Sequence, residues 1–192
     1  MGNFYVNHAV KDAEQKQVAD VLERAGRKAV VTPSQEGYVV VYDKEADTQA
    51  MEPILELGAL LSHEVERPVF AVLNHDDDVL CFWLFEGGAL VDSYNSDPGA
   101  FEDEEGTPPW QDGNAEKLCA RLGSNAEVAV VEAILRGDDV FAVERHEQLA
   151  RALSLPSCSI GFGYGYVANG ELVDDMNVDE LIFVGGRDDQ TR

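Results

Sequence analysis

The chain has 192 residues, of which 45% are hydrophobic and 27% are charged, a composition typical of a globular protein that buries its own core. Its 37 acidic and 14 basic residues give a net charge of −23, and only four of the acidic residues form the run at 102–105. A surface of this kind repels phosphate backbones and anionic lipids, so we expect neither a nucleic-acid partner nor a membrane partner. The charge can still serve to bind a basic protein, to bind a cation or simply to keep the protein soluble.

The cysteines and the N-terminal residues indicate where the protein resides. Cys81, Cys119 and Cys158 are far apart and form no C-x-x-C pair, so we predict neither a zinc site nor a redox dithiol. The first residues lack the basic and apolar segments of a signal peptide. The longest apolar run, 79–85, is too short to span a bilayer. These features favour a bacterial-type cytoplasm.

The first half of the chain alternates apolar periodicities of two and of 3.6 residues. Asp12 followed by Gln15 resembles a capping box at a helix start, and Gly26 ends that helix. A second helix covers 48–66, with Pro53 in its first turn. The Gly87-Gly88 pair predicts a tight hairpin. We predict strands at 4–10, 28–32, 38–42, 69–73, 79–85 and 89–94.

This order of elements predicts an α+β fold. The first six elements match a ferredoxin-like βαββαβ unit, and the last two strands extend its antiparallel sheet by a hairpin. The unbroken apolar runs at 69–73 and 79–85 indicate strands that are covered on both faces. We assign residues 1–97 to this α/β sheet domain.

The second half has a different texture. Residues 98–113 form an acidic loop that contains proline and glycine, and residues 114–184 form a smaller helical and β-hairpin subdomain. Asn169-Gly170 is a strong hairpin signal between strands at 160–167 and 171–173. Residues 185–192 are predicted to be a frayed tail. The remaining predictions are helices at 115–122, 124–135 and 146–153 and a short strand at 140–143.

The segment 74–78 contains an amide, an imidazole and three carboxylates at one predicted hairpin tip. Clustered oxygen ligands suit a divalent cation. However, consecutive aspartates lack the alternation of a known calcium loop, so we predict no metal and favour a solvated turn. His75 and Asp77 remain candidates for contact with a ligand or partner.

A second polar segment, 92–99, lies where the last predicted strand of the sheet ends. Loops that leave a rigid strand often carry function. Phe101 and Trp110 bracket the acidic run, either as anchors for a partner or as side chains that fix the loop to the body. From this region we predict these candidate contact residues: Asp92, Tyr94, Asn95, Asp97 and Trp110.

The segment 161–166 alternates glycine with aromatic residues. A nucleotide site would need a preceding strand, a following helix and often a lysine, so we predict no nucleotide cofactor here. On a strand, this alternation places Phe162, Tyr164 and Tyr166 on one face. The glycine face then permits close packing against another backbone.

Known catalytic signatures are missing from the sequence. It has no G-x-S-x-G, H-E-x-x-H or S-x-x-K motif, and the four histidines are scattered. The residues 146–156 resemble one helix of a helix-turn-helix, but the basic surface of a DNA reader is missing. We predict no catalytic residue, no cofactor and no metal.

Two functions fit these observations. The first is a non-enzymatic interaction or regulatory protein, of the immunity or inhibitor kind, that binds a basic partner. The alternative is a small-molecule-binding protein or enzyme with a polar site formed by segments 74–78 and 92–97. A third explanation of the charge is adaptation to a salty cytoplasm, which the five lysines would suit.

Overall fold

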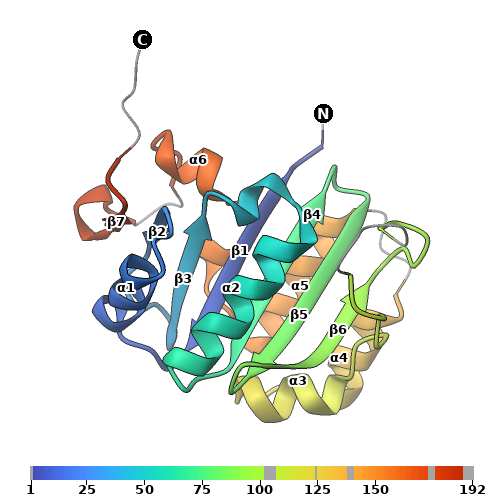
Figure 1. Ribbon diagram of the computed structural model, residues 1–192. Helices are drawn as coiled ribbons and strands as arrows, with labels where there is room; N and C mark the ends of the chain where they lie inside the picture. Colours follow the sequence, from blue (N-terminus) through green and yellow to red (C-terminus); the bar gives the residue numbers. More distant parts are fainter. Residues whose placement is uncertain (1, 102–106, 124, 138–140, 173–175, 188–192) are drawn as a thin grey trace.

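The computed structural model describes residues 2–101, 107–123, 125–137, 141–172 and 176–187. The predicted acidic run at 102–105 lies outside these residues. Seven strands form one antiparallel sheet in the order β6-β5-β4-β1-β3-β2-β7 (Figure 1). The strands are β1 Tyr5–Lys11, β2 Ala29–Val31, β3 Tyr38–Asp43, β4 Val69–His75, β5 Val79–Glu86, β6 Ala89–Asn95 and β7 Ile182–Val184.

Six α-helices are present in the described part of the chain, and they cover the sheet on both faces (Figure 1). Helices α1 and α2 pack on one face, and α3, α4, α5 and α6 pack on the other. The helices are α1 Gln15–Arg24, α2 Met51–Glu64, α3 Ala115–Leu122, α4 Val128–Leu135, α5 Ala142–Leu153 and α6 Tyr164–Ala168. Short 3-10 turns are η1 Ala46–Thr48, η2 Ser157–Ser159 and η3 Val178–Glu180.

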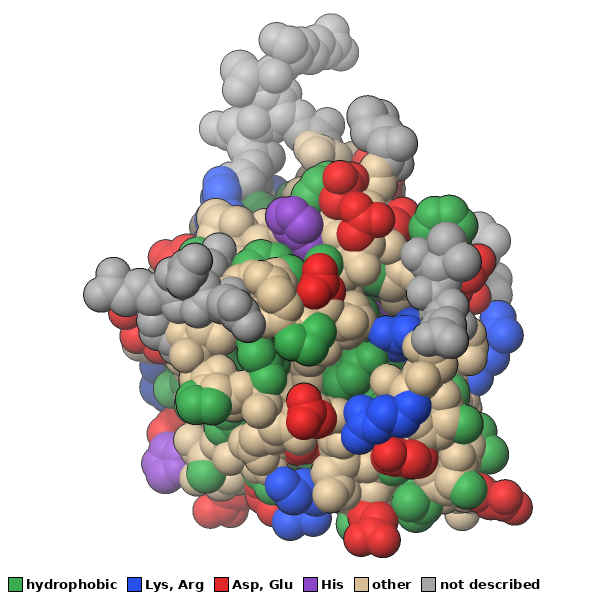
Figure 2. Space-filling model, turned by 90° about the vertical axis from the view of Figure 1, so that its right-hand side faces the viewer, with side chains coloured by type: hydrophobic (Ala, Val, Ile, Leu, Met, Phe, Trp, Pro, Cys, Tyr) green, Lys and Arg blue, Asp and Glu red, His purple; other side chains and the backbone are tan. Residues whose placement is uncertain are grey.

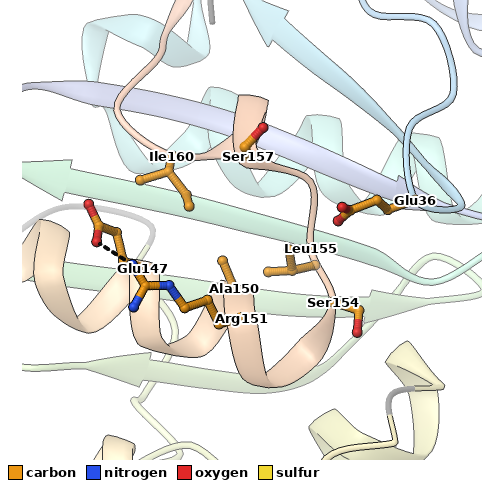
Figure 3. Close-up of a pocket in the computed structure, with 8 residues that line it drawn as sticks. All are labelled: Glu36, Glu147, Ala150, Arg151, Ser154, Leu155, Ser157 and Ile160. Carbon is orange, nitrogen blue, oxygen red and sulfur yellow. Dashed lines mark hydrogen bonds and ion pairs between the residues drawn. The ribbon is translucent and has the colours of Figure 1, made fainter. Parts of the chain in front are cut away.

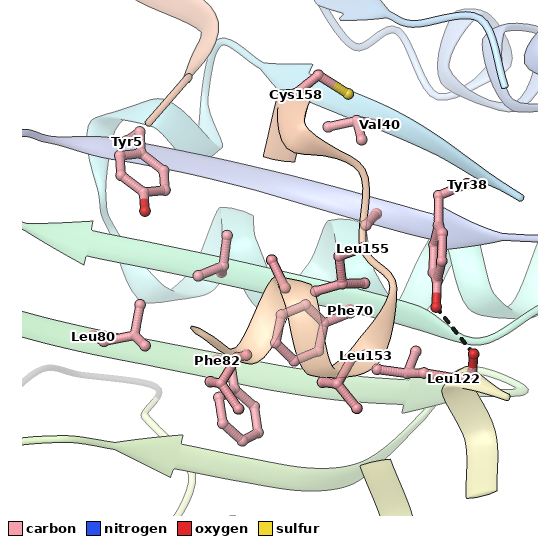
Figure 4. Packing of buried hydrophobic residues seen from close by; sticks show 14 of the residues in the cluster. Tyr5, Tyr38, Val40, Phe70, Leu80, Phe82, Leu122, Leu153, Leu155 and Cys158 are labelled. Carbon is pink, nitrogen blue, oxygen red and sulfur yellow. Dashed lines mark hydrogen bonds between the residues drawn. The ribbon is translucent and has the colours of Figure 1, made fainter. Parts of the chain in front are cut away.

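Two buried cores follow from the pleat of the sheet. Phe70 and Phe82 point toward α3–α6, with ring centroids 5.1 Å apart, whereas Trp83 and Phe85 point toward α2. Figure 4 shows the first core, where the Tyr38 hydroxyl donates to the carbonyl of Leu122 at 3.1 Å. Both faces of β4 and β5 are therefore buried, which confirms the expectation for the two apolar runs.

The α+β class and the antiparallel sheet are confirmed, although the sheet is larger than predicted. The extra strand, β7, pairs with β2 and lies just before the predicted frayed tail. Residues 188–192 of that tail lie outside the described part. Gly87 and Gly88, both with positive φ, form the predicted hairpin between β5 and β6.

Three local predictions in the second half are wrong. The expected hairpin at 160–173 is replaced by α6, and residues 173–175 lie outside the described part. Residues 142–143 of the expected short strand form the first turn of α5, and 138–140 are not described. Helix α4 begins at Val128 rather than at Ser124, which is itself not described.

The predicted capping box at Asp12 is also wrong. Asp12 has φ 46°, and its backbone N–H bonds to the carbonyl of Gly37 at 2.7 Å. Glu14 occupies the N-cap of α1 without a side-chain bond. Contact with the β2–β3 turn therefore determines the conformation of Asp12, in place of the local capping pattern.

Helix α2 approaches β5 closely at Gly58. A Cβ atom there would lie 2.3 Å from Cε2 of the buried Phe85 ring. We expect Gly58→Ala to lower the free energy of unfolding by about 1–3 kcal/mol, because the ring has little room to move. Denaturant unfolding would measure the loss. The double variant Gly58→Ala, Phe85→Leu should recover part of it, and additive losses would contradict the steric explanation.

Candidate functional site

The β4–β5 turn is a tight hairpin built from two aspartates. The N–H of Asp78 bonds to the carbonyl of His75 at 3.0 Å, and the two residues between them, Asp76 and Asp77, have φ 53° and 60°. Two consecutive left-handed residues are the geometry of a type I′ turn, which glycine or asparagine usually supplies. The turn therefore keeps its carboxylates despite a backbone conformation that favours glycine.

Hydrogen bonds of the two aspartates attach the turn to the N-terminal residues. The Asp77 carboxylate accepts from the N–H of Asn3 at 3.2 Å and from Nδ2 of Asn74 at 2.8 Å. The Asp76 carboxylate accepts from the N–H of Gly2 at 3.0 Å. Asp77 is half-buried, and its carboxylate has a structural role as an acceptor for the backbone N–H of Asn3. Asp76 and Asp78 are exposed.

Aromatic side chains surround the turn. The His75 ring meets the rings of Phe4 and Phe101 edge-on, with centroid distances of 5.0 and 5.5 Å. Its Nδ1 lies 2.6 Å from Oε1 of Gln49. Phe4 is 43% exposed.

A second exposed phenylalanine approaches the turn from α5. The N–H of Ala142 bonds to the carbonyl of Asp77 at 2.7 Å, which places the neighbouring Phe141 beside the turn. Phe141 is 50% exposed. Two exposed aromatic side chains thus lie near a turn that also carries the exposed carboxylates of Asp76 and Asp78.

The other candidate residues, from segment 92–97, do not all face the same side of the sheet, so they do not line a single site together with this turn. Asp92 and Tyr94 face α3–α5, whereas Asn95 faces the opposite side of the sheet. The Asp92 carboxylate is buried and accepts from the N–H of Asn114 at 2.7 Å. Burial raises the pKa of Asp92.

The chain beyond β6 is ordered by its own polar groups. Asn95 donates to the carbonyl of Ala100 at 2.8 Å and accepts from the N–H of Asp97 at 3.0 Å. Trp110 packs on Trp83 with ring centroids 5.5 Å apart. These contacts accord with the alternative in which turns and aromatic anchors fix the loop, while a role in partner contact stays a prediction.

One polar pocket does join the two predicted segments. It has a volume of about 380 Å³ and is lined by Asp78, Tyr94, Ser96, Leu135, Arg136, Gly137 and Arg145. The buried Arg145 donates to the Tyr94 hydroxyl at 2.8 Å and to the carbonyl of Gly137. Arg136 donates to the carbonyls of Asp112 and Gly113 at 2.6 and 3.0 Å. The sequence analysis did not single out either arginine, because neither Arg136 at the C-cap of α4 nor Arg145 in α5 belongs to a motif.

A larger open groove, of about 830 Å³, lies between α5 and the β2–β3 turn (Figure 3). Glu36 and Glu147 stand on its two sides, and Arg151 pairs with Glu147 at 3.3 Å. Ala150 and Leu155 form an apolar floor. The groove thus combines an apolar base with carboxylates at its edges, although nothing in its sequence segments suggested a site.

The buried histidines and cysteines lie where their chemistry is suppressed. Burial lowers the pKa of His8 to about 4 and that of His146 to about 3. His146 is fully buried, and its Nδ1 lies 2.7 Å from the Tyr5 hydroxyl. Burial also raises the pKa of Cys158 to about 12 and that of Cys81 still further. These groups stay neutral in the core, so we assign them structural roles.

The carboxylate of Asp47 packs against the backbone of the glycine-rich segment 161–166. The Asp47 side chain accepts from the N–H of Gly165 at 2.8 Å at the start of α6. A Cβ on Gly163 would lie 2.1 Å from Oδ1 of Asp47, so this position requires glycine. The expectation of close packing is correct, although a helix terminus provides it in place of a strand.

The described residues contain no group of three or more His, Cys, Asp or Glu side chains arranged to hold a metal ion. Within the same ranges, no helix is both long enough and apolar enough to cross a bilayer. Compared with protein-family models, curated proteins and solved structures, the chain gives no match. Its function is therefore inferred from its own geometry.

The buried His146 predicts a pH-dependent stability. Its pKa is lowered in the folded state, so below its ordinary pKa of about 6.5 the unfolded chain binds a proton that the native state does not. Stability should therefore fall with pH from about 6.5 toward 4, with this residue contributing about 1.4 kcal/mol per pH unit. His146→Asn, which keeps an acceptor for Tyr5, should reduce the slope by this amount in denaturant titrations, while the buried His8 continues to contribute its own part. The exposed His63→Gln should leave the slope unchanged, and equal slopes for all three proteins would refute the assignment.

Proposed function

We propose that the protein is a non-enzymatic interaction protein that binds a basic partner, in the manner of an immunity or inhibitor protein of a bacterial cytoplasm. The observation that carries the proposal is the β4–β5 turn, which bears the exposed carboxylates of Asp76 and Asp78 and has the exposed Phe4 and Phe141 nearby. Carboxylates steer and orient a cationic surface, and aromatic rings supply contact area and cation–π attraction. Both the bacterial and the cytoplasmic assignment remain part of this proposal.

The charge distribution supports recognition at a defined place. Figure 2 shows the face bearing the β6 edge, where acidic side chains stand at separate points among basic and hydrophobic ones. Long-range attraction from the net charge of −23 would bring a basic protein close, and the turn would then provide local contacts. Because exposed charges are screened by salt, association should weaken as ionic strength rises.

The alternative is a small-molecule-binding protein or enzyme. One observation favours it: Asp78, Tyr94 and Ser96, from the two predicted segments, share a polar pocket with Arg136 and Arg145. Guanidinium groups suit a carboxylate or phosphate ligand. Both arginines already bond to neighbouring protein oxygens, so we place this function second.

The fold supports a finer structural proposal. Strands β4-β1-β3-β2 lie in that order, and α1 and α2 cover one face, as in a ferredoxin-like βαββαβ unit. We infer that this unit forms the base on which β5 and β6 extend the sheet. The division into residues 1–97 and 114–184 remains a prediction, since β7 pairs with β2 and core residues of α3–α6 pack on the same sheet.

Neutralising the turn tests the proposed function. Asp76→Asn with Asp78→Asn keeps the backbone preference of the turn and removes two charges. We expect this double variant to bind a decalysine peptide about tenfold more weakly than the wild-type protein at low salt, because two close charge contacts are lost. Fluorescence anisotropy against salt concentration would measure both the affinity and its salt slope.

Glu23→Gln with Glu56→Gln is the matched control, since it removes the same charge from exposed positions of α1 and α2, which cover one face of the sheet. It should weaken binding by less than about twofold, through the screened long-range field alone. Equal losses in the two double variants would show that the turn has no special role. Binding that does not respond to salt would exclude the electrostatic mechanism.

A further inference from the structure

Helix α4 is apolar on the side that faces away from the core. Val131, Ile134 and Leu135 are buried against the sheet, as expected for a surface helix. Its two flanks carry Val128, 40% exposed, and Val130, 47% exposed. Ala129 and Ala133 are exposed on the same helix, and Glu132 is the sole charged residue between its ends. A helix that is apolar all round is usually covered on both sides.

An apolar groove runs along this exposed side. It has a volume of about 370 Å³ and is lined by Ala129, Val130, Ala133, Ile134, Gly137 and Gln148, and we call it the α4–α5 groove. Helix α4 has eight residues and therefore measures about 12 Å, which matches roughly two turns of a helix laid alongside it. Phe141, at the N-cap of α5, is a further exposed apolar side chain.

The basic groups near the α4–α5 groove are engaged. Arg136 bonds to Glu132 at 3.1 Å, and Arg151 bonds to Glu147 at 3.3 Å. Both pairs are neutral overall. They therefore contribute little net potential to a molecule lying in the groove.

Two exposed carboxylates are close in sequence to the residues that line the groove. Glu127 directly precedes α4, and Glu144 lies one turn before the lining residue Gln148 on the same side of α5. Within the described ranges, neither carboxylate forms an ion pair. The apolar groove is thus accompanied by two negative charges that no described cation offsets.

We propose that the α4–α5 groove is the docking site for a basic amphipathic helix of the partner. The apolar stripe of that helix lies against Ala129, Val130 and Ala133, and lysines or arginines beside the stripe meet Glu127 and Glu144. The charge argues against a second copy of this chain, because two copies would each bring −23 to the contact. This inference rests on the proposed function and names the form in which the basic partner is recognised.

Three labelled peptides and two variants at one position test the docking site. The peptides are a helical leucine–lysine peptide with an apolar stripe, the same composition in permuted order, and decalysine. The striped peptide should bind at least about tenfold more tightly than the permuted one, because only its leucines reach the groove together. Val130→Asn should weaken binding of the striped peptide about tenfold and leave decalysine unaffected, whereas Val130→Leu should retain binding. Circular dichroism would check that both variants keep their fold.

The outcomes separate the two proposals. Equal binding of striped and permuted peptides, with no effect of Val130→Asn, overturns the helix-docking inference while salt-sensitive decalysine binding still supports the proposed function. If the wild-type protein does not bind decalysine, both the proposed function and the helix-docking inference are overturned. Sedimentation that shows a dimer dissociated by Val130→Asn would identify a second copy as the occupant and overturn the inference in favour of self-association.

Discussion

Burial of the central strands on both faces is the constraint on which the rest of this structure depends. Strands β4 and β5 carry apolar side chains on each side of the pleat, so a single helical layer would leave half of them in water. Helices α1 and α2 cover one face, and the chain after β6 must return to cover the other. His146, for example, is buried against Tyr5, and burial keeps its imidazole neutral. Surface function is left to the ends of strands and to the outer sides of the helices.

The first half of the chain could be predicted because its signals are local. Apolar alternation, Gly87-Gly88 and Pro53 each specify structure within a few residues, and every strand expected up to Asn95 is present. In the second half, the helix predicted at 115–122 is confirmed as α3, but the strands expected at 140–143 and 160–173 are wrong, because distant contacts decide that part. Gly163 is close to Asp47 and serves a helix start, although its alternating pattern favours a strand. The three residues of β7 are too few for a periodic pattern, and they become a strand only by pairing with β2.

The candidate site shows the same division. Asp76–Asp78 stood out as a charged turn, yet the aromatic side chains near it come from distant parts of the chain, and no pattern links Phe4 to Phe141. The pocket that contains Asp78 and Tyr94 also includes Arg136 and Arg145, which belong to no motif in the sequence. The apolar outer side of α4 was visible in the sequence but resembled core, because periodicity alone does not say whether both sides of a helix are covered. Three-dimensional packing distinguishes these cases by placing one side of the helix in solvent.

The pairing of β7 with β2 has a consequence for biosynthesis. Strand β2 is made early, whereas its outer neighbour is translated near the end of the chain. A nascent chain on the ribosome therefore carries an open sheet edge until residues 182–184 emerge. An early stop codon that removes these residues would leave backbone groups of Val30 and its neighbours available to pair with other chains. Such a product should aggregate in the cell even though most of the buried core is already encoded.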